Sequence, residues 1–505
     1  MFAFLKKERT TLLDSKVQSN GFLRFCTNHG ALVFFYGIFL FLFEIKSLRN
    51  TITVVHFPLI AWAGLLAVYD IFVRRLWEKL PLWKPLFVFA VLAGVTALVN
   101  YETGLVSNIK SWVMVTLPLL SFLPLCLLCR KEDREKSLLS ALAGAAVVIF
   151  IASLVALVMF HLRISTVIEV FGVNYPAGIR YYIPDDPSSG ILLFGIYEDT
   201  NHAAAYAIVF AVYSLWLLSA CRRNVFAGWK RRVIAVFAWV NLVVQICYFP
   251  LANSRGGWLC LAVAAAACLL LYTFCTRFRS RKLWKRSLLS VAATALALVV
   301  LLGGLMLVRT GNSVVSRLVS TETSVIETTE PDVVPENADK KPAERPTLQD
   351  VFQKSDQTAG SGRIILWKEA MELYPKNPIL GTGPDNGQYY AEQHNVGCWL
   401  RKGTSIHNSY LDLLVEYGLL GTLAMLSFLF GCAVLILRRI FKHREGVPAQ
   451  EYFAVFCALF VAGVSALLTC IFVSTTAMYF LLLCFLGFAL ACCGDKHEKL
   501  LDSAQ

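Results

Sequence analysis

Long apolar runs separated by short polar segments dominate this chain from residue 31 to residue 492. Most of the runs are long enough to cross a lipid bilayer as an α-helix. Inside a bilayer only helices and closed barrels satisfy every backbone hydrogen-bonding group, so the pattern predicts an all-α polytopic transmembrane protein. We count about twelve candidate spans, at residues 31–45, 52–73, 85–99, 112–129, 138–160, 203–221, 233–251, 257–275, 288–308, 414–437, 451–470 and 472–492.

Two polar segments interrupt the apolar runs, at residues 161–202 and 309–407. The first contains NYPAGIRYYIPDDPSSG, whose Pro, Gly and Asp residues predict turns and irregular backbone. The second includes residues 318–360, which are rich in Thr, Glu, Pro, Asp and Lys. This composition cannot bury enough apolar surface to order itself, so we expect these residues to be flexible.

The second half of the large polar segment, 362–407, has a different character. Apolar residues at helical spacing after Arg363 predict a short amphipathic helix, which Pro375 and Pro378 end. The turn sequence GTGPDNG follows, and His407 opens the next apolar run. The predicted organisation is a cytoplasmic N-terminal segment at 1–29, transmembrane helices one to nine at 30–308, a large external loop at 309–407, helices ten to twelve at 408–493, and a cytoplasmic tail at 494–505.

Composition and charge narrow the class further. The chain has 505 residues, 57% hydrophobic and 16% charged, whereas soluble proteins carry about 25% charged residues. The net charge is +13. Under the positive-inside rule its distribution predicts a multi-pass protein of the cytoplasmic (inner) membrane with both termini in the cytoplasm and the two large loops outside. We attribute the basic excess to topology and expect no nucleic-acid partner. The basic residues concentrate in alternate short loops, at 74–84, 130–136, 222–232, 277–286 and 438–444.

Three cationic or imidazole side chains lie where predicted loops meet helices. Arg255 lies in the tight turn NSRGG, where a fixed guanidinium suits bidentate capture of phosphate. The alternative is an anchor residue that reaches the lipid headgroups. Arg363 precedes the amphipathic helix, a place where arginines are commonly only solvated. His407 stands at a helix entrance beside Asn408, where Asn is a common cap and His is commonly a polar interface residue.

The joint pattern resembles the O-antigen ligase and O-antigen polymerase family of bacterial membrane glycosyltransferases. The resemblance covers roughly residues 195–435, and the remaining spans match in architecture only. The 318–360 insertion has no counterpart in the family pattern, which leaves the acceptor open. The residues that carry the resemblance are NSRGGW at 253–258, GRIILWKEA at 362–370, NPILGTGPDNG at 377–387 and HNSYLDLLVEYGLLG at 407–421, with GIYEDTNHAAA at 195–205 as a weaker match.

The resemblance implies transfer of a glycan from an undecaprenyl-diphosphate-type carrier to an acceptor hydroxyl at the outer face of the membrane, in cell-surface polysaccharide biosynthesis. It implies Arg255 and Arg363 as the cationic residues and His407 as the catalytic histidine. Two guanidiniums would stabilise the departing diphosphate, and an imidazole would take the acceptor proton, so we expect no metal and no other cofactor. Attack opposite the diphosphate would invert the anomeric centre. The candidate substrate-binding residues are Arg180, Asn201, Asn408, Trp367 and Glu416.

The sequence leaves several functions open. In a ligase the acceptor is a lipid or a lipid-core sugar, and in a polymerase it is another carrier-linked repeat unit. A transporter or flippase of lipid-linked glycans has a similar number of spans, although transporters bury charges near the bilayer midplane and show internal repeats. A sensor or scaffold whose loop binds a partner is a further alternative. In the favoured reading the partners are the lipid-linked donor, a lipid or glycan acceptor and the surrounding membrane lipids.

Overall fold

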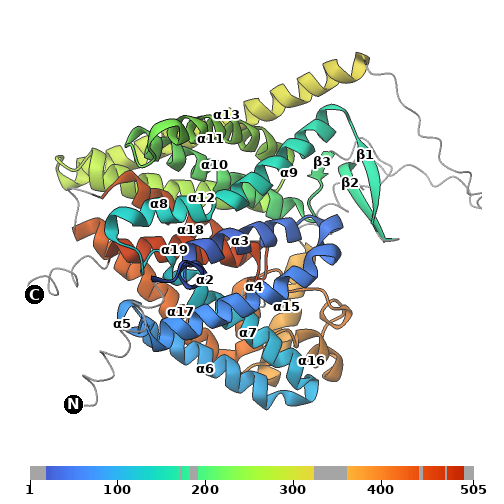
Figure 1. Ribbon diagram of the computed structural model, residues 1–505. Coiled ribbons are helices and arrows are strands. Elements are labelled where there is room, and N and C mark those ends of the chain that lie inside the picture. The colour runs from blue at the N-terminus through green and yellow to red at the C-terminus, as the bar shows by residue number, and fades with distance from the viewer. Residues whose placement is uncertain are drawn as a thin grey trace, which may run out of the picture.

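The computed structural model describes residues 19–170, 173–181, 191–322, 361–442, 447–471 and 475–493. Within these ranges the chain forms a bundle of helices with one small sheet (Figure 1). In this described part, nine helices are long and apolar enough to cross a membrane, and three shorter apolar helices accompany them. Every predicted span falls on one of these helices, so the predicted all-α polytopic fold is confirmed.

The helices are α2 (Gly21–Cys26), α3 (His29–Phe43), α4 (Lys46–Phe72), α5 (Leu76–Lys79), α6 (Trp83–Val99), α7 (Leu105–Ser121), α8 (Arg134–Ala141), α9 (Ala143–His161), α10 (Thr200–Arg222), α11 (Gly228–Leu251), α12 (Arg255–Tyr272), α13 (Leu283–Glu322), α15 (Ser361–Leu373), α16 (Gly387–Gln393), α17 (Ser409–Lys442), α18 (Ala449–Leu467) and α19 (Ala477–Cys493). Short 3₁₀ or π turns are η1 (Tyr101–Thr103), η2 (Leu123–Leu125), η3 (Lys131–Asp133), η5 (Thr273–Arg277), η6 (Tyr374–Lys376) and η7 (Leu400–Lys402).

Two helices extend beyond the apolar runs that predicted them. α7 begins at Leu105 rather than near residue 112, because its polar first turns bury Asn108 and Ser111 against the protein, which hydropathy does not register. α13 continues to Glu322, past the predicted start of the large loop at 309. No proline interrupts that extension, since the next one is Pro331. Most of the 318–360 insertion and the whole 494–505 tail lie outside the described residues.

The 161–202 segment contains a three-stranded antiparallel sheet in the order β1-β2-β3, where turns and irregular backbone were expected. The strands are β1 (Ser165–Val170), β2 (Val173–Tyr181) and β3 (Ile191–Gly195). Their β-branched and aromatic residues favour extended pairing, and a bulge at Gly178/Ile179 accommodates the glycine that the prediction counted as a turn signal. The expectation of irregular backbone is therefore wrong for these strands.

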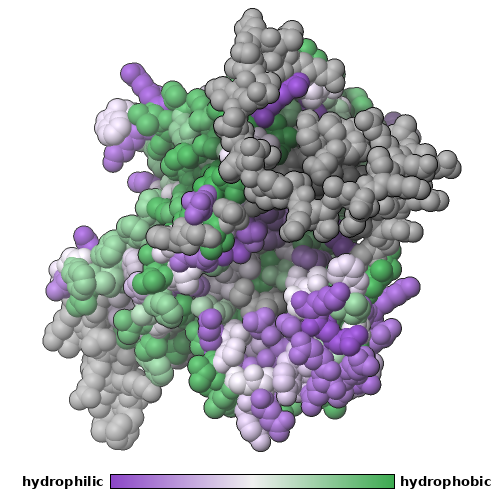
Figure 2. All heavy atoms as spheres, turned by 90° about the vertical axis from the view of Figure 1, so that its right-hand side faces the viewer, coloured by the Kyte–Doolittle hydropathy of each residue, from purple (hydrophilic) through white to green (hydrophobic). Residues whose placement is uncertain are grey.

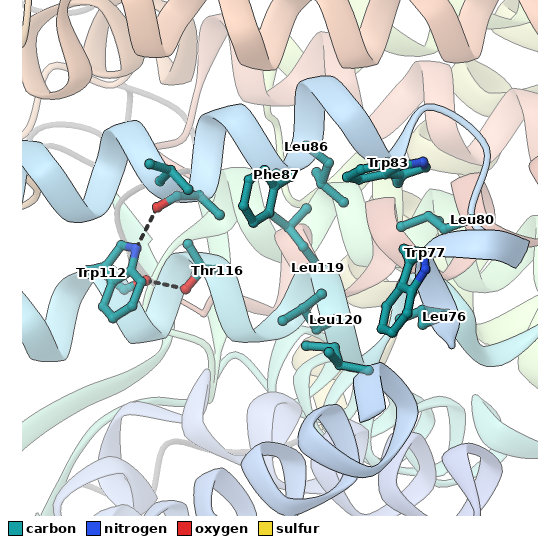
Figure 3. Close-up of a pocket in the computed structure, with 13 residues that line it drawn as sticks. Leu76, Trp77, Leu80, Trp83, Leu86, Phe87, Trp112, Thr116, Leu119 and Leu120 are labelled. Carbon is teal, nitrogen blue, oxygen red and sulfur yellow. Dashed lines mark hydrogen bonds between the residues drawn. The ribbon is translucent and has the colours of Figure 1, made fainter. Parts of the chain in front are cut away.

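The sheet, α15 and α16 lie at the right-hand end of Figure 1, and α5 lies at the left-hand end. Figure 2 looks onto the right-hand end, where hydrophilic side chains gather in the lower half. At the other end α5, α6 and α7 line an apolar groove (Figure 3). The bundle therefore has one strongly polar end, and the candidate site residues must be sought there.

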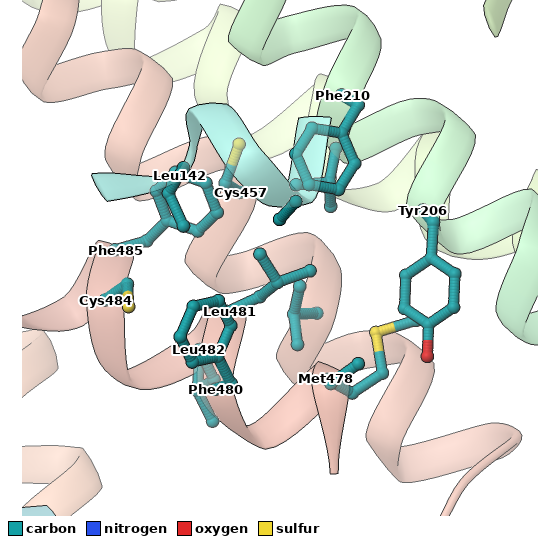
Figure 4. Packing of buried hydrophobic residues seen from close by; sticks show 14 of the residues in the cluster. Leu142, Tyr206, Phe210, Cys457, Met478, Phe480, Leu481, Leu482, Cys484 and Phe485 are labelled. Atoms are coloured by element: carbon teal, nitrogen blue, oxygen red, sulfur yellow. The ribbon is translucent and has the colours of Figure 1, made fainter. Parts of the chain in front are cut away.

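The centre of the bundle packs around α10 and α19, most of whose residues are buried. Figure 4 shows this packing, in which aromatic side chains such as Phe210 and Phe485 surround Cys457. Small residues on α10, including the run Ala203–Ala205, let neighbouring helices approach closely, as is usual between helices in membranes. Because α10 is packed in the centre of the bundle, the position of its N-terminus at the polar end is fixed.

Residues 361–406 form a small cap with its own apolar core at the polar end. Buried side chains from α15, α16 and the following turns pack against Val415 of α17. Within the cap, buried Glu369 accepts hydrogen bonds from the backbone N–H groups of Cys398, Trp399 and Leu400 at 2.8–3.0 Å. A charge-assisted network of this kind holds the turn at 398–400 to α15. The core residues of the cap are Leu366, Ala370, Leu373, Ala391, Val396, Leu400 and Ile406.

The glycine-rich turn docks the cap onto a break in α17. Gly418 lies inside α17 with φ 62° and ψ −169°, a conformation that essentially only glycine adopts. The break frees backbone groups for the turn: the N–H of Thr382 donates to Val415 O and that of Gly383 to Glu416 O, both at 2.9 Å, while the N–H of Leu419 donates to Pro378 O at 2.8 Å.

The α6–α7 hairpin holds the other side of the same turn. Thr96 Oγ1 donates to Leu380 O at 2.8 Å, and the amide of Asn100 donates to Gly381 O at 3.3 Å. Asn386 in turn donates to Asn108 Oδ1 on α7 at 3.0 Å. The turn is therefore clamped between α17 and the α6–α7 hairpin.

We expect Gly381→Ala or Gly418→Ala to destabilise the protein by about 1–3 kcal/mol. A Cβ on Gly381 would lie 2.4 Å from the Glu416 carbonyl, and one on Gly418 would lie 2.3 Å from Ile379 O. Gly387→Ala is the matched control in the same turn, because a Cβ there meets nothing within 4 Å. Thermal unfolding of the detergent-solubilised variants is the measurement. Equal unfolding midpoints for the Gly381 and Gly387 variants would contradict the clamp.

Candidate functional site

Five chain segments converge at the polar end of the bundle. They are the start of α10, the turn before α12, the start of α15, the residues before α17 and the loop after α18, and each contributes a contact described below. The starts of α12 and α17 have the same local backbone conformation. Asn253 and His407 both have left-handed backbone, with φ of 54° and 53°, and each precedes a helix cap, Ser254 and Asn408.

The start of α12 is tied to the start of α10. Ser254 Oγ accepts a hydrogen bond from the N–H of Gly257 at 3.1 Å and so caps α12. The same hydroxyl donates to Asn201 Oδ1 at 2.7 Å. Asp199 caps α10 by accepting from the N–H of Asn201 at 2.6 Å. Two helices far apart in sequence therefore begin side by side.

Arg255 is the first residue of α12 and its side chain is exposed. The next residue, Gly256, lies so close to the loop after α18 that a Cβ on it would come within 2.4 Å of the Leu468 side chain. The backbone of Leu468 in turn hydrogen-bonds His407. Gly256 and Leu468 thus link the residue next in sequence to Arg255 with His407.

His407 is half-buried, and the two residues that follow it are anchored by hydrogen bonds to backbone groups. Asn408 Oδ1 accepts from the N–H groups of Tyr410 and Leu411 at 3.0 and 3.1 Å and caps α17. Ser409 Oγ donates to Thr469 O and accepts from the N–H of Ile471, both at 2.8 Å. A left-handed histidine costs about 1–3 kcal/mol, so these flanking bonds are what fix its conformation.

Arg363 lies close enough to His407 for their charges to interact. Burial lowers the pKa of His407 below its ordinary value, and the positive charge of Arg363 lowers it further. Burial also lowers the pKa of Arg363, while the carboxylate of Asp199 opposes that change. The same carboxylate favours the protonated form of His407. Arg363, His407 and Asp199 therefore form one electrostatic cluster, drawn from α15, the α17 entrance and the α10 cap.

Of the candidate substrate-binding residues, some lie near this cluster and others do not. Asn201 adjoins the cluster, since its N–H donates to Asp199 and its side chain accepts from Ser254. The side-chain oxygen of Asn408 instead caps the N-terminus of α17. Trp367 is partly buried in the cap core, with no hydrogen-bond partner for its Nε1 among the described residues. Glu416 is buried beneath the glycine-rich turn. Arg180 lies in β2 opposite Leu192, and its side chain is outside what the structure describes.

Sequence reasoning missed an acidic group that completes the cluster. Glu44, at the end of α3, contacts His202 Nδ1 at 3.3 Å, and Arg49 forms an ion pair with Glu198 beside it. Burial alone would raise the pKa of Glu44, but the hydrogen bond and charge of His202 lower it below its ordinary value. The only signal in the sequence was a lone carboxylate at the end of an apolar run. Its partner is more than 150 residues away.

We expect Ser254→Ala to lower the free energy of unfolding by about 0.5–2 kcal/mol, because it removes the α12 cap and the bond to Asn201. The thermal unfolding midpoint of the detergent-solubilised protein is the measurement. Ser287→Ala is the control, since the exposed Ser287 hydroxyl bonds only to Leu283 O of its own helix. A midpoint for Ser254→Ala as high as that of the control would show that the two helix starts are joined by other contacts.

Comparison with known proteins found a similarity that includes the turn before α12, α15 and the start of α17. Residues 240–426 match the model of a family described as O-antigen ligase. The matched residues include Arg255, Arg363 and His407, and they lie inside the stretch that carries the resemblance seen in the sequence. Asn201 and Arg180 lie outside the match. No curated protein matches the chain.

The match supports a ligase- or polymerase-type glycosyltransferase role in cell-surface polysaccharide synthesis, and the apolar helices support a multi-pass membrane protein. The charged cluster at one polar end of an apolar bundle is in keeping with that role. Residues 240–426, which hold Arg255, Arg363 and His407, are thus similar to the O-antigen ligase family.

Proposed function

We propose that this protein transfers a glycan from an undecaprenyl-diphosphate-type carrier to an acceptor hydroxyl at the outer face of the cytoplasmic membrane. One observation carries the proposal: Arg363, His407 and Asp199 interact at the polar end of the bundle, and Gly256, the neighbour of Arg255, packs against Leu468, whose backbone hydrogen-bonds His407. Charged groups gathered at a membrane surface suit a substrate with a charged head and a long apolar tail. The positive-inside pattern supports an external position for this end.

Arg255 and Arg363 are the groups that bind the donor diphosphate. Guanidinium groups remain charged even when partly buried, and their planar arrangement of donors matches phosphate oxygens. Arg255 is exposed and Arg363 is half-buried, so the first is accessible to an arriving headgroup and the second acts where solvent screening is weaker. Electrostatic stabilisation of the leaving diphosphate is then supplied by the protein's own cations.

His407 is the general base. The lowered pKa keeps its imidazole neutral near pH 7, and a neutral imidazole can accept the proton of the acceptor hydroxyl. The hydroxyl oxygen forms a bond to the anomeric carbon as the bond from that carbon to the phosphate oxygen breaks. The diphosphate leaves with the bonding electrons, and the anomeric centre is inverted. Asp199 then stabilises the imidazolium that results.

Ligase and polymerase variants of this reaction share the donor chemistry and differ in the acceptor. The cluster described above contacts the donor and the proton to be removed, so it suits either acceptor. A flippase would instead require charged residues near the bilayer midplane. The location of the cluster at the end of the bundle favours an enzyme over a transporter.

We expect His407→Ala to reduce glycan transfer by about 10²–10⁴-fold, the usual contribution of a general base. The assay is joining of carrier-linked glycan to acceptor by the purified protein in proteoliposomes without an ion gradient. His394→Ala is the matched control, because His394 is an exposed histidine of the same cap that stacks on Tyr390. Undiminished joining by His407→Ala, with membrane insertion intact, would remove the proposed mechanism.

We expect the transfer rate to stay constant at neutral pH and to fall as the pH drops below the lowered pKa of His407, because protonation removes the base. Arg363→Gln removes a neighbouring positive charge, so the pKa of His407 should rise and the acid limb should move to higher pH. Arg363→Lys keeps the charge and should leave the acid limb in place, while both variants lose rate through weaker diphosphate binding. The pH–rate profile is the measurement. Identical acid limbs for the Gln and Lys variants would contradict the coupling.

A further inference from the structure

An apolar groove lies at the end of the bundle opposite the candidate site, between α5, α6, α7 and the end of α4. Its volume is about 480 Å³, within the range of small-molecule sites. Figure 3 shows Trp77 and Trp83 at one end of the groove and Trp112 at the other, with Phe87 and Leu119 between them. The proposed glycan transfer uses none of these residues.

The side chains that line the groove are apolar along most of the groove's length. The indole N–H of Trp112 donates to Ala90 O at 2.9 Å, and the hydroxyl of Thr116 donates to Trp112 O at 2.8 Å. Both polar groups are therefore already satisfied by backbone. Phe87 and Val91 line the groove and are 60% and 46% exposed. In a bilayer, these exposed apolar side chains of α6 would face lipid chains.

The length of the groove suits one leaflet. The α6 residues that line it run from Trp83 to Val91, a rise of about 12 Å along a helix. Half of the hydrocarbon core of a bilayer is about 15 Å thick. Trp77 and Trp83, at the α5 end of the groove, are the residue type that concentrates at the membrane–water interface. An acyl chain can therefore lie in the groove with its headgroup near these tryptophans.

Two exposed lysines lie at the same end. Arg74 is paired with Asp70 and Arg75 with Glu78, each at 3.0 Å. Lys79 and Lys84 are exposed, adjoin the lining residues Leu80 and Trp83 in sequence, and have no ion-pair partner among the described residues. Basic residues beside a cleft between transmembrane helices are a typical site for anionic lipid headgroups.

We propose that this groove binds an anionic glycerophospholipid, with an acyl chain between α6 and α7 and the phosphate at Lys79 and Lys84. The apolar walls select a hydrocarbon chain, and the two exposed ammonium groups select a headgroup with net negative charge. The α6–α7 hairpin that forms the groove also clamps the glycine-rich turn at its other end, through Asn100 and Asn108. The bound lipid therefore stabilises the hairpin that supports the cap.

The test measures thermal unfolding of the full chain in neutral detergent. Phosphatidylglycerol should raise the unfolding midpoint by several degrees more than phosphatidylcholine with the same acyl chains, and inorganic phosphate should leave it unchanged. Lys79→Gln/Lys84→Gln should abolish the difference between the two lipids. Lys230→Gln/Lys282→Gln, which removes the same charge from two exposed lysines elsewhere, should retain it.

Val91→Phe tests the groove itself. The larger side chain occupies the space of the acyl chain and should reduce the response to both lipids, whereas Val88→Phe, at an exposed α6 position outside the lining, should not. Native mass spectrometry gives a second measurement that does not depend on unfolding: co-purified anionic phospholipid should be retained by the wild type and lost from the double lysine variant. Equal shifts with both lipids, a preference that survives in Lys79→Gln/Lys84→Gln, or a normal lipid response of Val91→Phe would each overturn the proposal.

Discussion

Backbone hydrogen bonds between residues 378–383 and the interrupted helix α17 hold the polar cap on the bundle. Inside a membrane protein such bonds form only where a helix gives up its own, because every backbone group needs a partner. The left-handed Gly418 breaks the helix and releases those groups to the turn at 381–383. The α6–α7 hairpin secures the other side of the turn through Asn100. The positions of Arg363, before the turn, and His407, after it, both depend on this clamp.

The arrangement of charge follows from the cost of burying it. Ionised side chains are expensive within the hydrocarbon region, so they gather at the ends of the helices or pair with one another. At the polar end, three carboxylates (Glu44, Asp199 and Glu198) face the cationic and imidazole groups of Arg49, His202 and Arg363. Arg255 alone of the proposed catalytic residues is exposed. It is therefore the cation best placed to meet an incoming diphosphate.

The two ends of the bundle are connected by the same pair of helices. α6 and α7 form the apolar groove near α5 and reach the glycine-rich turn at their other ends. Packing at one end of a rigid helix pair constrains the other, because close-packed interiors deform little. A lipid in the groove and a substrate at the cap would both act on this hairpin. Through a lipid bound there, membrane composition would affect the stability of the polar end.

The sequence by itself determined the class of fold, because long apolar runs can be accommodated only as membrane-spanning helices, and each predicted run falls on a helix. It also singled out Arg255, Arg363 and His407, since charged residues at helix entrances stand out against an apolar background. It did not reveal the strands at 165–195, where proline and glycine obscured a sheet that pairing stabilises. Only the tertiary structure brought Asp199, His202 and Glu44 to that site, because their proximity depends on how α3 and α10 pack. Hydropathy reports the solvent that each segment prefers, and the packing of the helices decides which of their ends meet.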